Sequence, residues 1–238
     1  MVRPLPRDPM IRQANRYLDD TYLFKCTTKV IETGRDHDGQ GLWVALEENI
    51  AHPQGGGQPS DRVTLNGSRA EPVFAPDGFG AMAPVRLRLG EVEAPVEGAT
   101  VDIEIDEDSR CRHAALHTGG HLLHWVLQEF GWQATKGNHF PGESRVEFRA
   151  KDGEPPAPWD EIAETVAARC RALLAEAPRV TAWMEGTTRL TRIGETENVP
   201  CAGTHVDHLG RIDAFALIGG KVKKGILKLR YDATHIAL

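Results

Sequence analysis

Two histidines four residues apart, His117 and His121, form the first pair whose types and spacing could do chemistry. In an α-helix, residues i and i+4 lie on one face with their Cβ atoms about 6 Å apart, so both imidazoles could reach one metal ion. His113 stands four residues earlier, so helical spacing alone leaves open which two histidines would bind. A zinc protease would need a glutamate directly after the first histidine, and Thr118 stands there instead, which excludes that chemistry.

A second pair of metal-ligand types, Cys201 and His205, follows about 80 residues later with the same four-residue spacing. Thiolate and imidazole are ligands that zinc prefers, and two pairs together complete a tetrahedron. Cys201 follows Pro200, which indicates a tight loop rather than a helix. The alternative is a small buried cysteine beside a hydrogen-bonded core histidine. Four protein ligands would leave no open zinc position, whereas a catalytic zinc needs a vacancy or a displaceable ligand.

Composition and charge restrict the class of protein. The chain has 238 residues and a formal net charge of -6, which argues against nonspecific coating of nucleic acid. No apolar run approaches the roughly 20 residues that span a bilayer, and the N-terminal MVRPLPRDPM has no apolar core of a signal peptide. The 4 cysteines are scattered and form no CxxC pair. These features predict a cytoplasmic protein without a disulfide framework.

The elements that must position the two pairs fall into two regions. Residues 22–105 show short alternating apolar patterns separated by turn-rich stretches such as HPQGGGQPSD (52–61) and APDGFGAMAP (75–84), which predicts a small β-barrel. Capping residues at 106–109 precede a helix that carries the two histidines, and Gly131 is its expected stop. After a loop at 152–158, a second helix is expected from about Trp159 to Pro178. We predict an α+β fold, with a barrel domain over 1–106 and a second α+β domain over 107–238.

Four stretches of the sequence resemble a known family. They are HTGGHLLH (117–124), CAGTHV (201–206), HPQGGGQPSD (52–61) and YLDDTYLFKCTTKVIE (17–32). The first three resemble the HTATHLLH, CGGTHV and YPEGGGQPGD-type motifs of alanyl-tRNA synthetase editing domains, and the fourth resembles the start of that family. No aminoacylation domain precedes them in this sequence, so the chain is similar over nearly its whole length to the free-standing AlaX editing proteins.

The resemblance implies a fold, a reaction and a metal. The fold would be a small β-barrel followed by a zinc-containing editing domain of the threonyl/alanyl-tRNA synthetase type. The reaction would be hydrolysis of serine or glycine from the acceptor end of mischarged tRNA(Ala), with no membrane and no obligate protein partner. Carried over by position, the ligands of a Zn²⁺ ion would be His117, His121, Cys201 and His205. The ion would either activate the attacking water or hold the substrate while another water attacks.

The residues that would form the amino-acid pocket are predicted less directly. The glycine-rich loop would contribute Gly55, Gly56, Gly57 and Gln58. Separating serine from alanine requires a hydrogen-bond partner for the serine hydroxyl. The residue before the second histidine is threonine in the synthetase-type motif, but it is Gly120 here, so we expect Gly119 and Gly120 to reshape the pocket and the hydroxyl partner to lie elsewhere. The candidates for that partner are Thr118, Thr135, Thr204 and Gln58.

Basic residues in two parts of the chain are the candidates for contact with tRNA phosphates. They are Lys136 together with the cluster Lys221, Lys223, Lys224, Lys228 and Arg230. The alternative is a solvated strand edge, which lysines often protect from pairing.

Three other functions remain open at the level of sequence. The editing domain of threonyl-tRNA synthetase shares both histidine and cysteine spacings and would act on Ser-tRNA(Thr), although the upstream GGGQ motif favours the alanyl branch. A zinc-stabilised module could bind tRNA or protein without turnover. A repurposed pocket could hydrolyse a small ester or amide.

Overall fold

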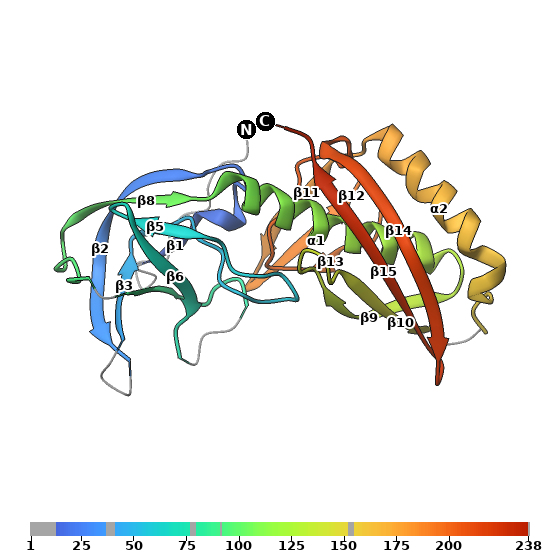
Figure 1. Ribbon diagram of the computed structural model, residues 1–238, viewed down its shortest axis with the longest axis horizontal. Coiled ribbons are helices and arrows are strands. Elements are labelled where there is room, and N and C mark those ends of the chain that lie inside the picture. Colours follow the sequence, from blue (N-terminus) through green and yellow to red (C-terminus); the bar gives the residue numbers. More distant parts are fainter. Residues whose placement is uncertain (1–12, 37–40, 77–79, 91, 152–154, 238) are drawn as a thin grey trace.

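The computed structural model describes residues 13–36, 41–76, 80–90, 92–151 and 155–237. The N-terminal stretch considered for a signal peptide, and parts of the two turn-rich stretches at 75–84 and 152–158, lie outside the described residues. The molecule is elongated, with a barrel at one end and a sheet with two helices at the other (Figure 1). Among the helices of the described residues, none combines the length and apolar character needed to cross a membrane.

The first half folds into a closed barrel with the strand order β2-β3-β7-β6-β5-β8. Its strands are β2 (Lys25–Arg35), β3 (Leu42–Leu46), β5 (Val63–Leu65), β6 (Ser68–Phe74), β7 (Val85–Leu89) and β8 (Thr100–Ile105). Val101, Ile103 and Ile105 of β8 point into the barrel core and alternate with exposed neighbours. The predicted small barrel is therefore confirmed. Two short strands, β1 (Ala14–Asn15) and β4 (Glu48–Asn49), pair in parallel beside the 3₁₀ helix η1 (Arg16–Leu18).

The second half is a mixed α/β arrangement around helix α1 (Glu107–Gln128). One antiparallel sheet has the order β14 (Ile212–Lys223), β15 (Ile226–His235), β10 (Arg145–Ala150), β9 (Trp132–Asn138). A second sheet joins β11 (Val180–Glu185), β12 (Thr188–Ile193) and β13 (Val199–Pro200), and the chain also contains α2 (Trp159–Glu176) and η2 (Leu209–Arg211). β8 ends at Ile105 and α1 begins at Glu107, so the domain boundary that we proposed falls at this junction.

Helix α1 begins as its sequence predicts. The Asp106 side chain accepts a hydrogen bond from the Ser109 backbone N–H at 2.9 Å, which satisfies one of the unpaired donors of the first turn. After the helix ends at Gln128, Gly131 adopts a φ of +80° in the turn that leads to β9. Most of α1 is buried, and its closest packing partners include β15 and β9. A helix enclosed in this way holds its side chains in fixed positions even with glycines in its interior.

A buried ion pair joins α1 to the barrel. The Arg110 guanidinium binds the Asp61 carboxylate, with Nε 2.9 Å from Oδ1, and neither side chain is exposed. The same guanidinium donates to the backbone carbonyls of Thr21 at 3.0 Å and Ile50 at 2.6 Å. The Asp61 carboxylate also accepts from the His52 backbone N–H at 2.6 Å. Because Asp61 and His52 are the two ends of the glycine-rich stretch 52–61, this pair fastens that loop against the helix.

We predict that replacing Arg110 with methionine lowers the free energy of unfolding by about 3–5 kcal/mol, because it leaves the Asp61 carboxylate buried without its partner. Urea denaturation of both proteins measures this difference. The matched control is Arg169→Met, which removes the partly exposed Arg169–Glu129 pair (3.4 Å) and should cost less than about 1 kcal/mol. Similar stability losses in the two variants would contradict the anchoring role of the buried pair.

Candidate metal centre and adjoining pocket

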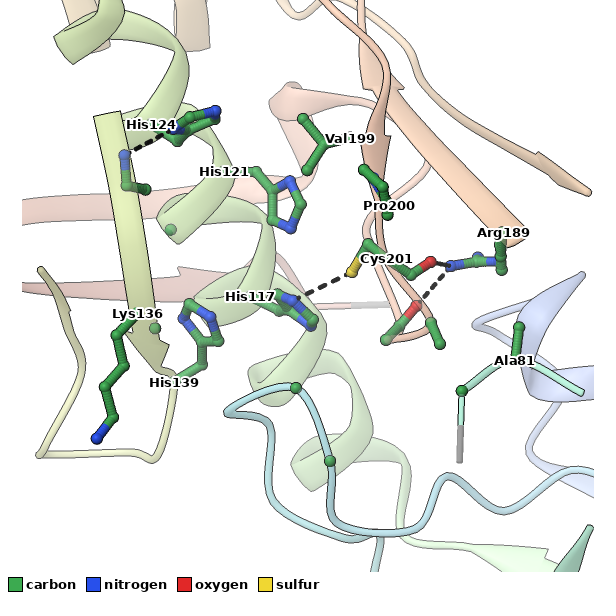
Figure 2. A pocket seen from close by; sticks show the side chains of 18 of the residues that line it. Ala81, His117, His121, His124, Lys136, His139, Arg189, Val199, Pro200 and Cys201 are labelled. Atoms are coloured by element: carbon green, nitrogen blue, oxygen red, sulfur yellow. Dashed lines mark hydrogen bonds between the residues drawn. The ribbon is translucent and has the colours of Figure 1, made fainter. Parts of the chain in front are cut away.

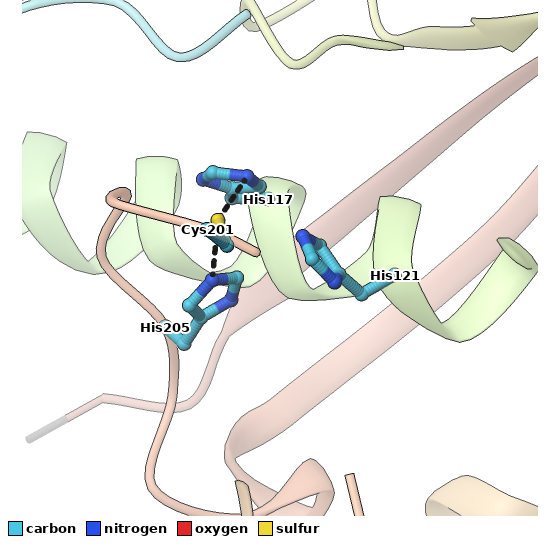
Figure 3. A group of neighbouring side chains, drawn as sticks. All are labelled: His117, His121, Cys201 and His205. Atoms are coloured by element: carbon cyan, nitrogen blue, oxygen red, sulfur yellow. Dashed lines mark hydrogen bonds between the residues drawn. The ribbon is translucent and has the colours of Figure 1, made fainter. Parts of the chain in front are cut away.

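Four side chains converge at the junction of α1 and the loop that follows β13. His117 and His121 project from one face of α1, and Cys201 and His205 come from the loop (Figure 3). One nitrogen or sulfur atom of each lies within 4.8 Å of the others, so the group could hold a metal ion. Both four-residue pairs identified from the sequence therefore meet in space, although they lie about 80 residues apart in the chain.

Two of the donor-atom distances are close to those expected between ligands of one small ion. Cys201 Sγ lies 3.4 Å from His117 Nε2 and 3.2 Å from His205 Nε2. Metal–ligand bonds of about 2.0–2.3 Å in a tetrahedral arrangement separate neighbouring ligand atoms by about 3.3–3.8 Å. Three imidazoles and one thiolate are the donor set that zinc favours. The chemistry and the spacing of these residues therefore fit a zinc ion.

Gln58 fixes the orientation of the first ligand. Its Oε1 accepts a hydrogen bond from His117 Nδ1 at 2.7 Å, which leaves His117 Nε2 free to coordinate. The same Oε1 accepts from the Thr204 backbone N–H at 3.0 Å, and Gln58 Nε2 donates to Thr204 Oγ1 at 2.9 Å. Gln58 and Thr204 are fully buried. The glycine-rich loop thus supports the candidate metal ligands through a side chain that the barrel half supplies.

Thr118 contacts His205 in the same way that Gln58 contacts His117. Its hydroxyl oxygen lies 3.2 Å from His205 Nδ1 and accepts from the Val206 backbone N–H, also at 3.2 Å. The Nε2 atom of His205 is the one that faces the Sγ of Cys201. Hydrogen bonding at Nδ1 therefore directs Nε2 toward the group of four, as it does for His117.

Arg189 holds the loop that contains Cys201 (Figure 2). Its guanidinium donates to the carbonyls of Cys201 and Gly203, each at 2.9 Å, and to the carbonyl of Leu18 at 2.7 Å. Burial raises the pKa of the Cys201 thiol, while a backbone hydrogen bond from Gly203 and the Arg189 charge act in the opposite direction. A buried cation therefore supports the thiolate form that a metal would require.

The imidazoles of the group are held in their neutral form. Burial lowers the pKa of His121 to about 3, with a further contribution from His139. Burial also lowers the pKa values of His117 and His205 well below the usual range, and neighbouring histidines lower them further. Neutral imidazole is the form that coordinates metal, so the surroundings of these ligands favour binding over protonation.

A cavity of about 570 Å³ opens beside the four side chains. Figure 2 shows its wall, where His117 and His121 of α1 lie between Lys136 and His139 on one side and the segment from Val199 to Cys201 on the other. Of the residues predicted to form a pocket, those that line the cavity are Gly55, Gly56, Gly120 and Thr135. The predicted phosphate contact Lys136 also lies on this wall.

The remaining predicted pocket residues lie behind the wall. Gln58, Thr118 and Thr204 are fully buried and do not line the cavity, because their polar atoms are engaged by the metal-ligand side chains and the loop. Gly57 packs against β9: a Cβ at this position would lie 2.5 Å from the Gly137 carbonyl oxygen. The structure therefore places these four residues behind the cavity wall and not on its surface.

The two glycines of α1 have different surroundings. A Cβ on Gly119 would meet the rings of Phe215 and Tyr231, each at 3.2 Å, so this glycine permits close packing of helix on sheet and does not shape the cavity. A Cβ on Gly120 would lie 2.4 Å from Cε1 of His139. The expectation of a reshaped pocket therefore applies to the position of Gly120 alone.

The basic cluster lies away from the cavity. Lys221, Lys223, Lys224, Lys228 and Arg230 are exposed on β14, β15 and the turn between them. Lys228 Nζ pairs with Glu147 Oε1 at 2.8 Å across the sheet.

Among the wall residues that the sequence does not predict are His139 and Arg189. His139 is buried at the end of β9, and burial lowers its pKa to about 4, so its ring is neutral at pH 7. A single histidine or arginine without a paired ligand type has no distinguishing pattern in sequence. Only the tertiary contacts identify them.

Comparison with known proteins adds an independent observation. No family model matches the chain. It is 32% identical over 200 residues to the alanyl-tRNA editing protein AlaX-M of Pyrococcus horikoshii, covering 82% of this chain and 86% of that protein. It is 28% identical over 218 residues to AlaX-M of Methanosarcina mazei, covering 80% and 86%. The alanine–tRNA ligase of Caldivirga maquilingensis is 27% identical over 250 residues, covering 93% of this chain and 27% of the ligase.

We predict that Gln58→Ala lowers zinc affinity about 10- to 100-fold, because removing a hydrogen-bond partner of a ligating histidine typically has an effect of that size. Competition with a chromophoric chelator measures the affinity. Cys201→Ala, which removes a ligand atom, should lower it further. Thr135→Ala is the matched control on the cavity wall and should bind zinc as tightly as the unaltered protein. Unchanged affinity in Gln58→Ala would contradict the supporting role.

Proposed function

The chain belongs to the AlaX family of alanyl-tRNA editing proteins, and we propose from this membership that it is a hydrolase that removes serine, and also glycine, from mischarged tRNA(Ala). The observation that carries the proposal is a group of four metal-ligand side chains beside a cavity whose wall includes glycines of the upstream GGGQ motif.

The cavity is suited to the end of an aminoacylated tRNA. Its volume of about 570 Å³ falls within the usual range for pockets that enclose a small ligand. Gly55 and Gly56 have no side chains, so the backbone of the loop can approach a terminal nucleoside closely. An aminoacyl ester is already labile, and the enzyme needs mainly to position a water and to stabilise the developing oxyanion.

We propose that His117, His121, Cys201 and His205 hold one Zn²⁺ ion. When bound, the ion supplies positive charge next to the cavity, which polarises or orients the ester group. The neighbouring residues position the ligands. Gln58 and Thr118 keep the histidine Nε2 atoms directed at the ion, and Arg189 keeps the cysteine loop in place.

The basic residues are proposed to hold the tRNA backbone. Lys136 lies on the cavity wall, where it could meet the phosphates nearest the acceptor end.

On the open face of the sheet, Lys228 and Arg230 are exposed and alternate with buried leucines. Arg230 lies directly opposite Arg145 in the strand register. Like charges directly opposite each other on paired strands repel, so binding of an anionic partner between these two arginines would relieve the repulsion. The cluster at Lys221, Lys223 and Lys224 extends the same basic surface.

A deacylation panel tests the proposed reaction. Zinc-loaded protein is expected to hydrolyse Ser-tRNA(Ala) and Gly-tRNA(Ala) and to spare Ala-tRNA(Ala). Initial rates of release of labelled amino acid are the measurement. Preference for Ser-tRNA(Thr) would instead assign the chain to threonyl editing. Binding of every mischarged tRNA without turnover would make it a binding module, and hydrolysis of small esters alone would indicate a repurposed pocket.

Salt dependence tests the basic surface. We expect kcat/KM for Ser-tRNA(Ala) to fall steeply with salt, because binding at phosphates releases counterions. Changing Lys221, Lys223 and Lys224 together to glutamine should flatten the slope of log kcat/KM against log salt by about 0.9 for each duplex phosphate that these lysines neutralise. Lys25→Gln on the barrel, where the lysine is similarly exposed, should leave the slope unchanged. A rate insensitive to salt would count against phosphate binding by this surface.

A further inference from the structure

The ring of His139 occupies a slot formed by three glycines from three separate elements. A Cβ on Gly120 of α1 would lie 2.4 Å from His139 Cε1, and a Cβ on Gly137 of β9 would lie 2.5 Å from Nε2. A Cβ on Gly57 of the glycine-rich loop would lie 3.3 Å from Cδ2. Real Cβ atoms essentially never approach within 3.0 Å, so the imidazole has its place because residues 120 and 137 have no side chain.

Tyr231 fixes which nitrogen of the ring bears the proton. The Tyr231 hydroxyl donates to the backbone carbonyl of Leu116 at 2.7 Å, and a carbonyl oxygen can only accept. With its proton engaged, the hydroxyl oxygen accepts from His139 Nδ1 at 2.6 Å. In the neutral ring, Nε2 then carries a free lone pair. No described residue supplies a hydrogen bond to this Nε2, and the ring forms part of the cavity wall.

The ring also lies next to the candidate metal centre. It stacks on His117 with 4.5 Å between the ring centroids and 20° between the planes (Figure 2). His139 therefore borders the part of the cavity that lies next to His117. Of the four hydroxyl partners expected from the sequence, Gln58, Thr118 and Thr204 lie behind the wall, and Thr135 Oγ1 donates to the Glu147 carbonyl at 3.2 Å.

We propose that His139 is a specificity-determining residue whose Nε2 accepts a hydrogen bond from the hydroxyl of a seryl group in the cavity. The inference rests on the proposed editing function and assigns the recognition of its substrate to one atom. Glycine and alanine have no hydroxyl to donate, so they leave this acceptor unpaired, and an unpaired buried acceptor is unfavourable. His139 can occupy this position only because residue 120 has no side chain.

The test compares seryl and glycyl substrates on the same tRNA(Ala). His139→Leu, which keeps bulk but has no acceptor, should lower the ratio of kcat/KM for Ser-tRNA(Ala) to that for Gly-tRNA(Ala) by about 10- to 100-fold, the usual effect of losing one such hydrogen bond. The glycyl rate should remain within about threefold. His139→Gln, whose amide oxygen reaches the region of Nε2, should recover much of the ratio. His124→Leu, a second histidine on the cavity wall, is the matched control and should keep the ratio.

A second variant distinguishes a loss of recognition from a folding defect of His139→Leu. Gly120→Ala adds a methyl group that must displace the His139 ring, while alanine itself favours the helix. It should also lower the seryl-to-glycyl ratio with zinc content unchanged, and its thermal midpoint is measured to show that the variant is folded at the assay temperature. A ratio that stays the same in both variants, or an equal loss on both substrates, would overturn the inference. If the unaltered protein hydrolyses neither substrate, the proposed function fails instead, and the two failures are distinguishable.

Discussion

The buried ion pair between Arg110 and Asp61 is the constraint on which the site depends. Burying two charges is costly unless the remaining donors and acceptors find partners. Here the Thr21 and Ile50 carbonyls and the His52 N–H supply them. The result is a fixed distance between the barrel half and α1. Asp61 ends the glycine-rich stretch 52–61, and Gln58 of the same stretch accepts a hydrogen bond from His117. The orientation of a candidate metal ligand therefore depends on a contact between the two halves.

The same principle recurs around the candidate metal centre. Each strongly polar group near the ligands is buried and bonded to backbone: Arg189 to three carbonyls, Gln58 to the Thr204 N–H, and Thr118 to the Val206 N–H. Such networks are stabilising only when every member is satisfied, and a satisfied network is rigid. Rigidity is what a metal site requires, since small displacements of a ligand weaken coordination. The centre is therefore held by hydrogen bonds that extend from both halves of the molecule, through Leu18 as well as Gln58.

The two neighbouring glycines of α1, Gly119 and Gly120, have different structural roles. Gly119 brings α1 close to the sheet, where Phe215 and Tyr231 pack against it. Gly120, one residue later on a different side of the helix, leaves space that His139 fills. The helix tolerates both because it is enclosed by packing, and packing contributes far more to its stability than intrinsic propensity. In this family member, a proposed recognition atom thus comes from the end of β9 and not from the helix that carries two metal ligands.

The sequence by itself determined the features that follow from local periodicity and ligand type. Alternation in β7 and β8 predicted the barrel strands, and the cap at Asp106 predicted the start of α1. The four-residue spacings indicated two pairs of metal-ligand types, and the resemblance to editing domains assigned the four residues that the fold brings together. Only the tertiary structure decided which polar residues face the cavity. Gln58 and Thr204 meet across 146 residues, and His139 meets Tyr231 across 92. The reason is physical: spacing along a helix or strand sets which side chains share a face, whereas the partner of a loop side chain depends on distant segments that the packing of the core brings together.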